Sequence, residues 1–121
     1  MFIVPNDVQA WDPRKLEFDK WQTMDIALES AYLVTSILDW RQTTYGSEHP
    51  DRFYEKNQIM GRYPSERTIN TFFAVRAILH PLITHVLPEK YHIRAIFQSV
   101  TLLESADAVR NNYAIGVKIR F

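Results

Sequence analysis

The stretch that decides the fold is residues 24–45, MDIALESAYLVTSILDWRQTTY, in which polar side chains interrupt an apolar run at helical spacing. At 3.6 residues per turn the polar side chains fall within about 80° of one another, and apolar residues fill the rest of the circumference. Gly46 follows, and glycine is common just past the end of a helix. The stretch therefore predicts a long helix that protein or lipid hides from water on nearly all sides. Its polar row consists of Asp25, Glu29, Tyr32, Ser36, Asp39 and Thr43.

Two more long helices are predicted in the second half of the chain. Ser65 is a favourable N-cap for a helix that runs to about Leu87, and Pro81 is expected to kink that helix because proline has no backbone N–H to donate. The third helix is predicted from residues 88–89 to about residue 112. Both are mostly apolar, so three long apolar helices make up the predicted fold.

The remaining segments are predicted to be a loop and two short strand-like ends in a single all-α domain, residues 1–121. Glycines and prolines punctuate residues 46–64, which is typical of a long structured loop. Residues 2–4 are strand-like, and residues 117–121 alternate apolar with basic side chains, which is the period of a half-buried strand. Such ends can pair with a strand of a neighbouring chain. The predicted interface residues are Phe2, Ile3, Val117, Ile119 and Phe121.

Charge and composition argue against several classes of function. The 14 lysines and arginines are matched by 14 aspartates and glutamates, so no basic field attracts nucleic acid. The chain has no cysteine, which excludes disulfides, thiolate metal sites and cysteine nucleophiles. No cationic segment precedes the apolar start, so no secretory signal is predicted. We expect a cytoplasmic or virion-associated protein, with a membrane location as the alternative.

Polar residues recur inside the apolar second and third helices. Arg76, His80 and Thr84 follow one another at i, i+4 and i+8, and Glu104 shares a face with apolar residues of the third helix. A buried carboxylate costs several kcal/mol unless it is paired or protonated, so Asp39, Arg76 and Glu104 are predicted to face one another. The predicted buried cluster, which also includes His80, is either a structural ion pair or a proton-handling site. A separate polar row in the third helix consists of Arg94, Gln98, Thr101 and Ser105.

Motifs for metals, nucleotides and nucleophilic hydrolysis do not occur. The four histidines include no i, i+4 pair, and HExxH, GxGxxG, GxxxxGK[ST] and GxSxG are all missing. We therefore predict no metal and no cofactor. Asp39 and Glu55 could act together as acid and base, but nothing in the sequence fixes their separation.

Two segments around the predicted loop carry a family resemblance. Residues 39–43, DWRQT, and 55–65, EKNQIMGRYPS, resemble the D-W-x-Q-T and E-x-N-P-I-L-G-x-x-P-S motifs of small helical proteins of bacteria and phages, a group without an established function. Gln58 and Met60 stand where that pattern has proline and leucine. The resemblance covers residues 21–117, and some relatives look membrane-associated. It implies that Asp39, Thr43, Glu55, Asn57 and Ser65 cluster around the loop.

Three functions are compatible with these patterns. The first is a non-enzymatic structural or assembly protein, such as a phage virion component, that packs against itself or another protein, because exposed apolar faces usually mark interfaces. The second is a small membrane-associated helical protein; residues 69–87 approach the roughly 20 apolar residues of a membrane span, but Arg76 lies in their middle. The third is an enzyme with an acidic site at Asp39 and Glu55.

Overall fold

The computed structural model describes residues 18–121 and folds them into three long helices. They are α1 (Thr23–Ser47), α2 (Glu66–Val86) and α3 (Ile93–Ala114), and a short 3-10 turn, Lys90–His92, joins the last two. No strand occurs among the described residues. The predicted all-α fold with three long helices is therefore confirmed.

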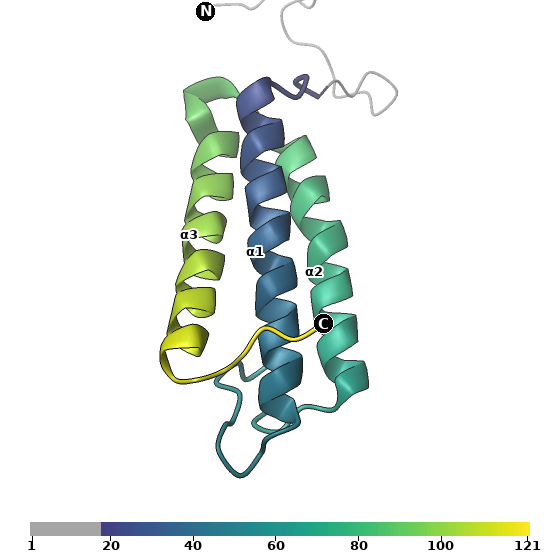
Figure 1. The fold of residues 1–121 in the computed structure, drawn as a ribbon. Helices are drawn as coiled ribbons and strands as arrows, with labels where there is room; N and C mark the ends of the chain where they lie inside the picture. The colour runs from purple at the N-terminus through teal and green to yellow at the C-terminus, as the bar shows by residue number, and fades with distance from the viewer. Residues whose placement is uncertain (1–17) are drawn as a thin grey trace, which may run out of the picture.

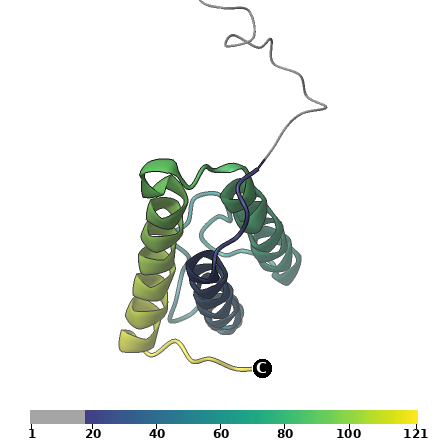
Figure 2. The ribbon, with the colours of Figure 1, turned by 90° about the horizontal axis from the view of Figure 1, so that it is seen from above.

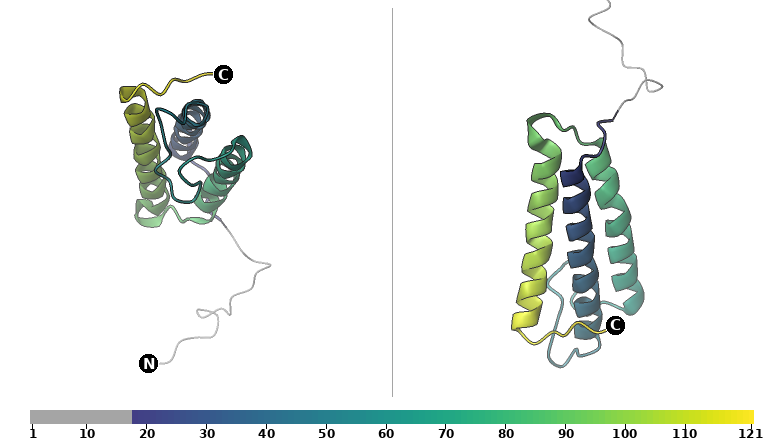
Figure 3. Two further views of the ribbon diagram at one scale, coloured as in Figure 1. Left: turned by 90° about the horizontal axis from the view of Figure 1, so that it is seen from below. Right: turned by 45° about the horizontal axis from the view of Figure 1, so that its top comes forward.

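The middle helix of the bundle is α1, which packs against both α2 and α3 (Figure 1). Seen from above, the three helices occupy the corners of a triangle (Figure 2). The loop of residues 48–65 connects α1 to α2 at one end, and the turn into α3 lies at the other end, so α1 and α3 run in the same direction (Figure 3). α2 and α3 make few contacts with each other, which makes α1 the element that holds the bundle together.

Side chains cap the N-terminal ends of two of the three long helices. The backbone N–H of Gln22 donates to the Asp25 carboxylate at 2.7 Å, so this N–H at the start of α1 has a partner. The Ser65 hydroxyl accepts from the Thr68 amide at 3.1 Å, so the predicted N-cap of α2 is confirmed. The predicted start of the third helix at residues 88–89 is wrong. Tyr91 and His92 have φ values of 59° and 58°, and this left-handed turn delays α3 until Ile93.

The predicted strand at residues 117–121 is absent from the described part of the chain. This segment instead crosses the end of α1 as irregular chain (Figure 1). The Arg41 Nε donates to the Arg120 carbonyl at 2.6 Å, and Val117, predicted as an interface residue, is only 5% exposed within its own chain. Ile119 and Phe121 are exposed. The predicted strand at 2–4, with Phe2 and Ile3, lies outside the described residues.

The distribution of side chains is the reverse of an ordinary globular core. The buried apolar cluster is small and consists of Met60, Ile69 and Phe73, with Trp40 and Phe72 packed against it. Most other large apolar side chains of the helices point outward, whereas apolar residues are usually the most buried type. We call this exposed surface the apolar belt; it consists of Met24, Ile26, Val34, Ile37, Val75, Ile78, Leu79, Leu82, Ile83, Val86, Ile93, Ile96, Val100 and Leu103. None of the three helices combines the length and apolar character needed to cross a membrane.

Candidate functional site

A row of polar side chains runs along the inside of the bundle, where the three helices face one another. The residues from α1 are those of the polar row that its sequence predicts, and they meet polar residues of α2 and α3. Buried polar groups are stable only when they are hydrogen-bonded, so these contacts fix how the helices pack. We call this interior the polar seam; it consists of Asp25, Glu29, Tyr32, Ser36, Asp39, Thr43, Arg76, His80, Thr84, Arg94, Gln98, Thr101 and Ser105.

Arg94 closes the seam at the end where α2 turns into α3. Its side chain is 0% exposed and lies 3.1 Å from the Asp25 carboxylate and 2.9 Å from that of Glu89. The same guanidinium donates to backbone carbonyls of Leu87 and His85. Burial opposes ionisation of Asp25, but hydrogen bonds from Glu89, Gln22 and Arg94 outweigh it and hold the Asp25 pKa below its ordinary value. The shared contact with Asp25 raises the Glu89 pKa.

His80 occupies the middle of the seam and joins all three helices. Its Nδ1 lies 2.8 Å from the Glu29 carboxylate of α1, and its Nε2 lies 2.6 Å from the Thr101 hydroxyl of α3. The imidazole stacks between Tyr32 and Phe97, with ring centroids 3.5 and 4.8 Å away. The order carboxylate, imidazole, hydroxyl is that of a catalytic triad. However, Thr101 also bonds to the Phe97 carbonyl of its own helix and lines neither described cavity, so it presents no nucleophile to a substrate.

Arg76 links the centre of the seam to Asp39. Its Nε donates to the Tyr32 hydroxyl at 2.5 Å, and its Nη1 lies 3.8 Å from the Asp39 carboxylate. The predicted approach of Arg76 to Asp39 is thus present, at the outer limit of an ion pair. The predicted burial of Glu104 is wrong, because this residue is exposed.

Asp39 is the seam residue with the most perturbed ionisation. Burial raises its pKa from 3.8 to about 6, and the nearby negative charge of Glu55 adds to this effect. Arg76, Thr43 and Asn112 act in the opposite direction, the last through a hydrogen bond of 3.2 Å from its amide. Asp39 and Glu55 therefore lie near enough to interact, as the acidic-site hypothesis requires.

The other predicted loop residues mainly shape the backbone. The Asn57 side chain accepts from the backbone N–H of Ile59 at 3.0 Å, and the backbone N–H of Asn57 donates to the Glu55 carboxylate at 3.0 Å. Ser65 is exposed and caps α2, whereas Thr43 donates to Asp39 at 3.4 Å. Of the predicted loop cluster, Thr43 and Glu55 thus lie near Asp39. Asn57 instead stabilises a turn of the loop, and Ser65 caps α2. A cavity of about 630 Å³ beside this loop is lined by Thr43, Glu55, Arg62 and Asn112, among others.

The sequence did not identify the α3 residues that complete the seam. Arg94, Gln98 and Ser105 were predicted as a separate polar row, yet all three are buried. The Gln98 amide donates to the Asp25 carbonyl at 2.9 Å and to the Glu29 carboxylate at 3.2 Å. The signal that could have found them is their spacing, because they repeat at about one helical turn, as the polar row of α1 does.

The seam offers little that could hold a metal or cofactor. Among residues 18–121, no group of three histidine, aspartate or glutamate side chains is placed to bind a metal ion. Most seam groups already bond to one another, which is typical of a structural network. No family model matches the chain, and no curated protein or solved structure shows significant similarity to it. The resemblance to small helical bacterial and phage proteins therefore stays a prediction.

The ionisation of Asp39 predicts a dependence of stability on pH. Because the folded state raises the Asp39 pKa to about 6, it binds this proton more tightly than the unfolded chain does, and stability falls as pH rises from about 4 to about 6. Asp39→Asn lacks this titration. We expect the variant to gain up to about 3 kcal/mol relative to the parent between pH 4 and pH 7.

Urea unfolding of both proteins at the two pH values measures this difference. Groups such as Asp25 titrate in both proteins, so their contributions cancel in the comparison. A difference in stability that stays constant with pH would show that the Asp39 pKa is not raised.

Proposed function

We propose that the protein is a non-enzymatic structural component that works with its apolar belt covered by other protein, either copies of itself or a different chain. The supporting observation is the reversed distribution of side chains: charged residues such as Arg94 and Glu29 are buried, whereas Val100 is 58% exposed. An apolar surface on all three helices is costly in water, and large exposed apolar patches mark interaction sites. The seam then serves to hold the helices in register while their outer faces bind partners.

An acidic enzyme site at Asp39 and Glu55 is less well supported. Oδ1 of Asp39 accepts from Thr43 and Asn112, Oδ2 lies 3.8 Å from Arg76, and the residue lines neither described cavity. A general acid or base needs free access to the proton that it transfers. The geometry therefore favours a structural role for this carboxylate.

The oligomeric state tests the proposal. We expect size exclusion with light scattering on untagged, detergent-free protein to give a defined oligomer. Leu82, which is 54% exposed in the middle of the belt, should be part of the contact, so Leu82→Asp is expected to dissociate the oligomer. Ile115→Asp is the matched control, since Ile115 is 66% exposed but lies after the end of α3, outside the belt. A monodisperse monomer in the parent protein would contradict the proposal.

A membrane-associated protein is the second candidate, and one observation favours it. No charged side chain of α1 is exposed, and in α2 only Glu66 and Arg67 at its start are, both helices being described in full. Lipid could cover the uncharged surface of α1 and α2, whereas α3 carries the exposed charges Glu104, Asp107 and Arg110. This candidate predicts that the protein stays with membranes during alkaline washing and is released only by detergent. Release by salt or alkali would count against it.

A further inference from the structure

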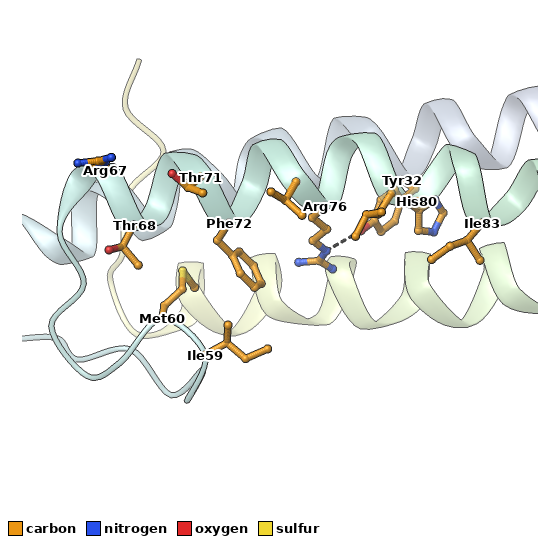
Figure 4. A pocket seen from close by; sticks show the side chains of 12 residues that line it. Tyr32, Ile59, Met60, Arg67, Thr68, Thr71, Phe72, Arg76, His80 and Ile83 are labelled. Atoms are coloured by element: carbon orange, nitrogen blue, oxygen red, sulfur yellow. Dashed lines mark hydrogen bonds between the residues drawn. The ribbon is translucent and has the colours of Figure 1, made fainter.

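An open apolar groove runs along one side of α2, and its lining includes Tyr32 of α1. It has a volume of about 680 Å³, and its walls include Phe72, Val75, Leu79 and Ile83, which follow one another on the helix. Ile59 and Met60 of the loop cover it near Phe72 (Figure 4). From Phe72 to Ile83 the helix rises about 16 Å at 1.5 Å per residue. This length is close to the roughly 15 Å depth of hydrocarbon in one leaflet, half of a core of about 30 Å.

The polar groups at the surface of the groove gather at one end. Arg67, Thr68 and Thr71 lie where α2 begins, beyond Phe72 (Figure 4). Arg67 is exposed and forms no ion pair among the described residues. In contrast, Arg76, which lines the middle of the groove together with Tyr32 and His80, donates from its Nε to the Tyr32 hydroxyl, and its Nη1 lies 3.8 Å from the Asp39 carboxylate. The groove therefore ends in a cation that forms no ion pair within the described residues, and its walls along α2 are mostly apolar.

We propose that this groove binds one acyl chain of an anionic phospholipid, with the lipid phosphate at Arg67 and the hydroxyls of Thr68 and Thr71. This inference goes beyond the structural function proposed above, because it assigns a lipid to Val75, Leu79 and Ile83 and leaves only the rest of the apolar belt to protein partners. Arginine is well suited to phosphate because its planar guanidinium offers several donors. An extended peptide in the same groove would desolvate its backbone N–H and C=O groups against apolar walls, whereas an acyl chain has no polar groups to desolvate.

The test compares two lipids that differ only in headgroup charge. The full-length protein in an uncharged detergent is titrated with dioleoylphosphatidylglycerol and with dioleoylphosphatidylcholine, and native mass spectrometry counts the lipids retained. We expect tighter, saturable binding of the phosphatidylglycerol. Arg67→Gln should weaken that binding about tenfold, the usual scale of one charge-assisted hydrogen bond, and leave phosphatidylcholine unchanged.

Two further variants test whether the acyl chain lies in the groove. Leu79→Trp and Val75→Trp fill the groove from positions that are about half exposed, so the fold should persist, as circular dichroism can verify, while retention of both lipids falls. Arg62→Gln is the matched charge control, because Arg62 is exposed but does not line this groove. Equal losses in Arg62→Gln and Arg67→Gln, or unchanged binding in both tryptophan variants, would overturn the proposal. It would also be overturned if inorganic phosphate alone bound as tightly, or if the tryptophan variants changed the oligomeric state instead of lipid retention.

Discussion

Arg94→Met is expected to lower the free energy of unfolding strongly, because it removes the most extensively bonded side chain of the interior. Arg94 is fully buried, pairs with Asp25 and Glu89, and donates to carbonyls at the ends of α1 and α2. Its loss leaves the Asp25 carboxylate buried without its cation. Breaking a buried ion pair from one side costs about 3–5 kcal/mol, a large part of the 5–15 kcal/mol that stabilises a typical domain. Thermal unfolding followed by circular dichroism measures the loss.

Arg110→Met is the matched control on the same helix. Arg110 forms its ion pair with Asp107 at 2.9 Å, and both side chains are largely exposed. Such surface pairs contribute about 0–1 kcal/mol, so this variant should unfold close to the parent. Arg94→Lys should fall between the two, because an ammonium keeps the charge but cannot replace the fork of donors. An Arg94→Met protein that melts with the parent would refute the structural role of this residue.

The sequence could predict the helices because their signals are local. The Ser65 hydroxyl caps the first turn of α2, which begins at the next residue, and Gly46 lies within two residues of the end of α1. The late start of α3 could not be predicted in this way. It depends on left-handed backbone at Tyr91 and His92; histidine is enriched in this conformation, but the signal is weak, and tyrosine gives none.

The candidate site could be predicted only in part, and the errors of this prediction share one cause. Glu104 was predicted to be buried because its neighbours on α3, including Val100, are apolar, and apolar faces usually point inward. In this protein the apolar face points outward, so Glu104 and Val100 are both exposed. The same reversal buries Arg94 and Gln98. Polar spacing identified which residues share a row, but the contacts between helices decide which rows face one another.

The pair Glu29–His80 predicts a large effect that a second substitution should cancel. His80→Phe is expected to cost about 3–5 kcal/mol, because it leaves the Glu29 carboxylate buried with only Thr84 and Gln98 as donors. Phenylalanine keeps an aromatic ring between Tyr32 and Phe97, so the loss would report the missing hydrogen-bond partner of Glu29 and not a cavity. Urea unfolding of the single variant measures it.

The double variant Glu29→Leu/His80→Phe should recover most of this loss, because replacing both members of a buried pair with apolar residues is often neutral. The remaining partners stay bonded: Gln98 still donates to the Asp25 carbonyl, Thr84 to the backbone of residue 80, and Thr101 to the Phe97 carbonyl. A coupling energy near zero between the two substitutions would contradict a mutual interaction of these side chains. Recovery would mean that this part of the seam specifies the register of the helices and adds little net stability. Such a result supports a structural role for the Glu29–His80 pair over a proton-handling one.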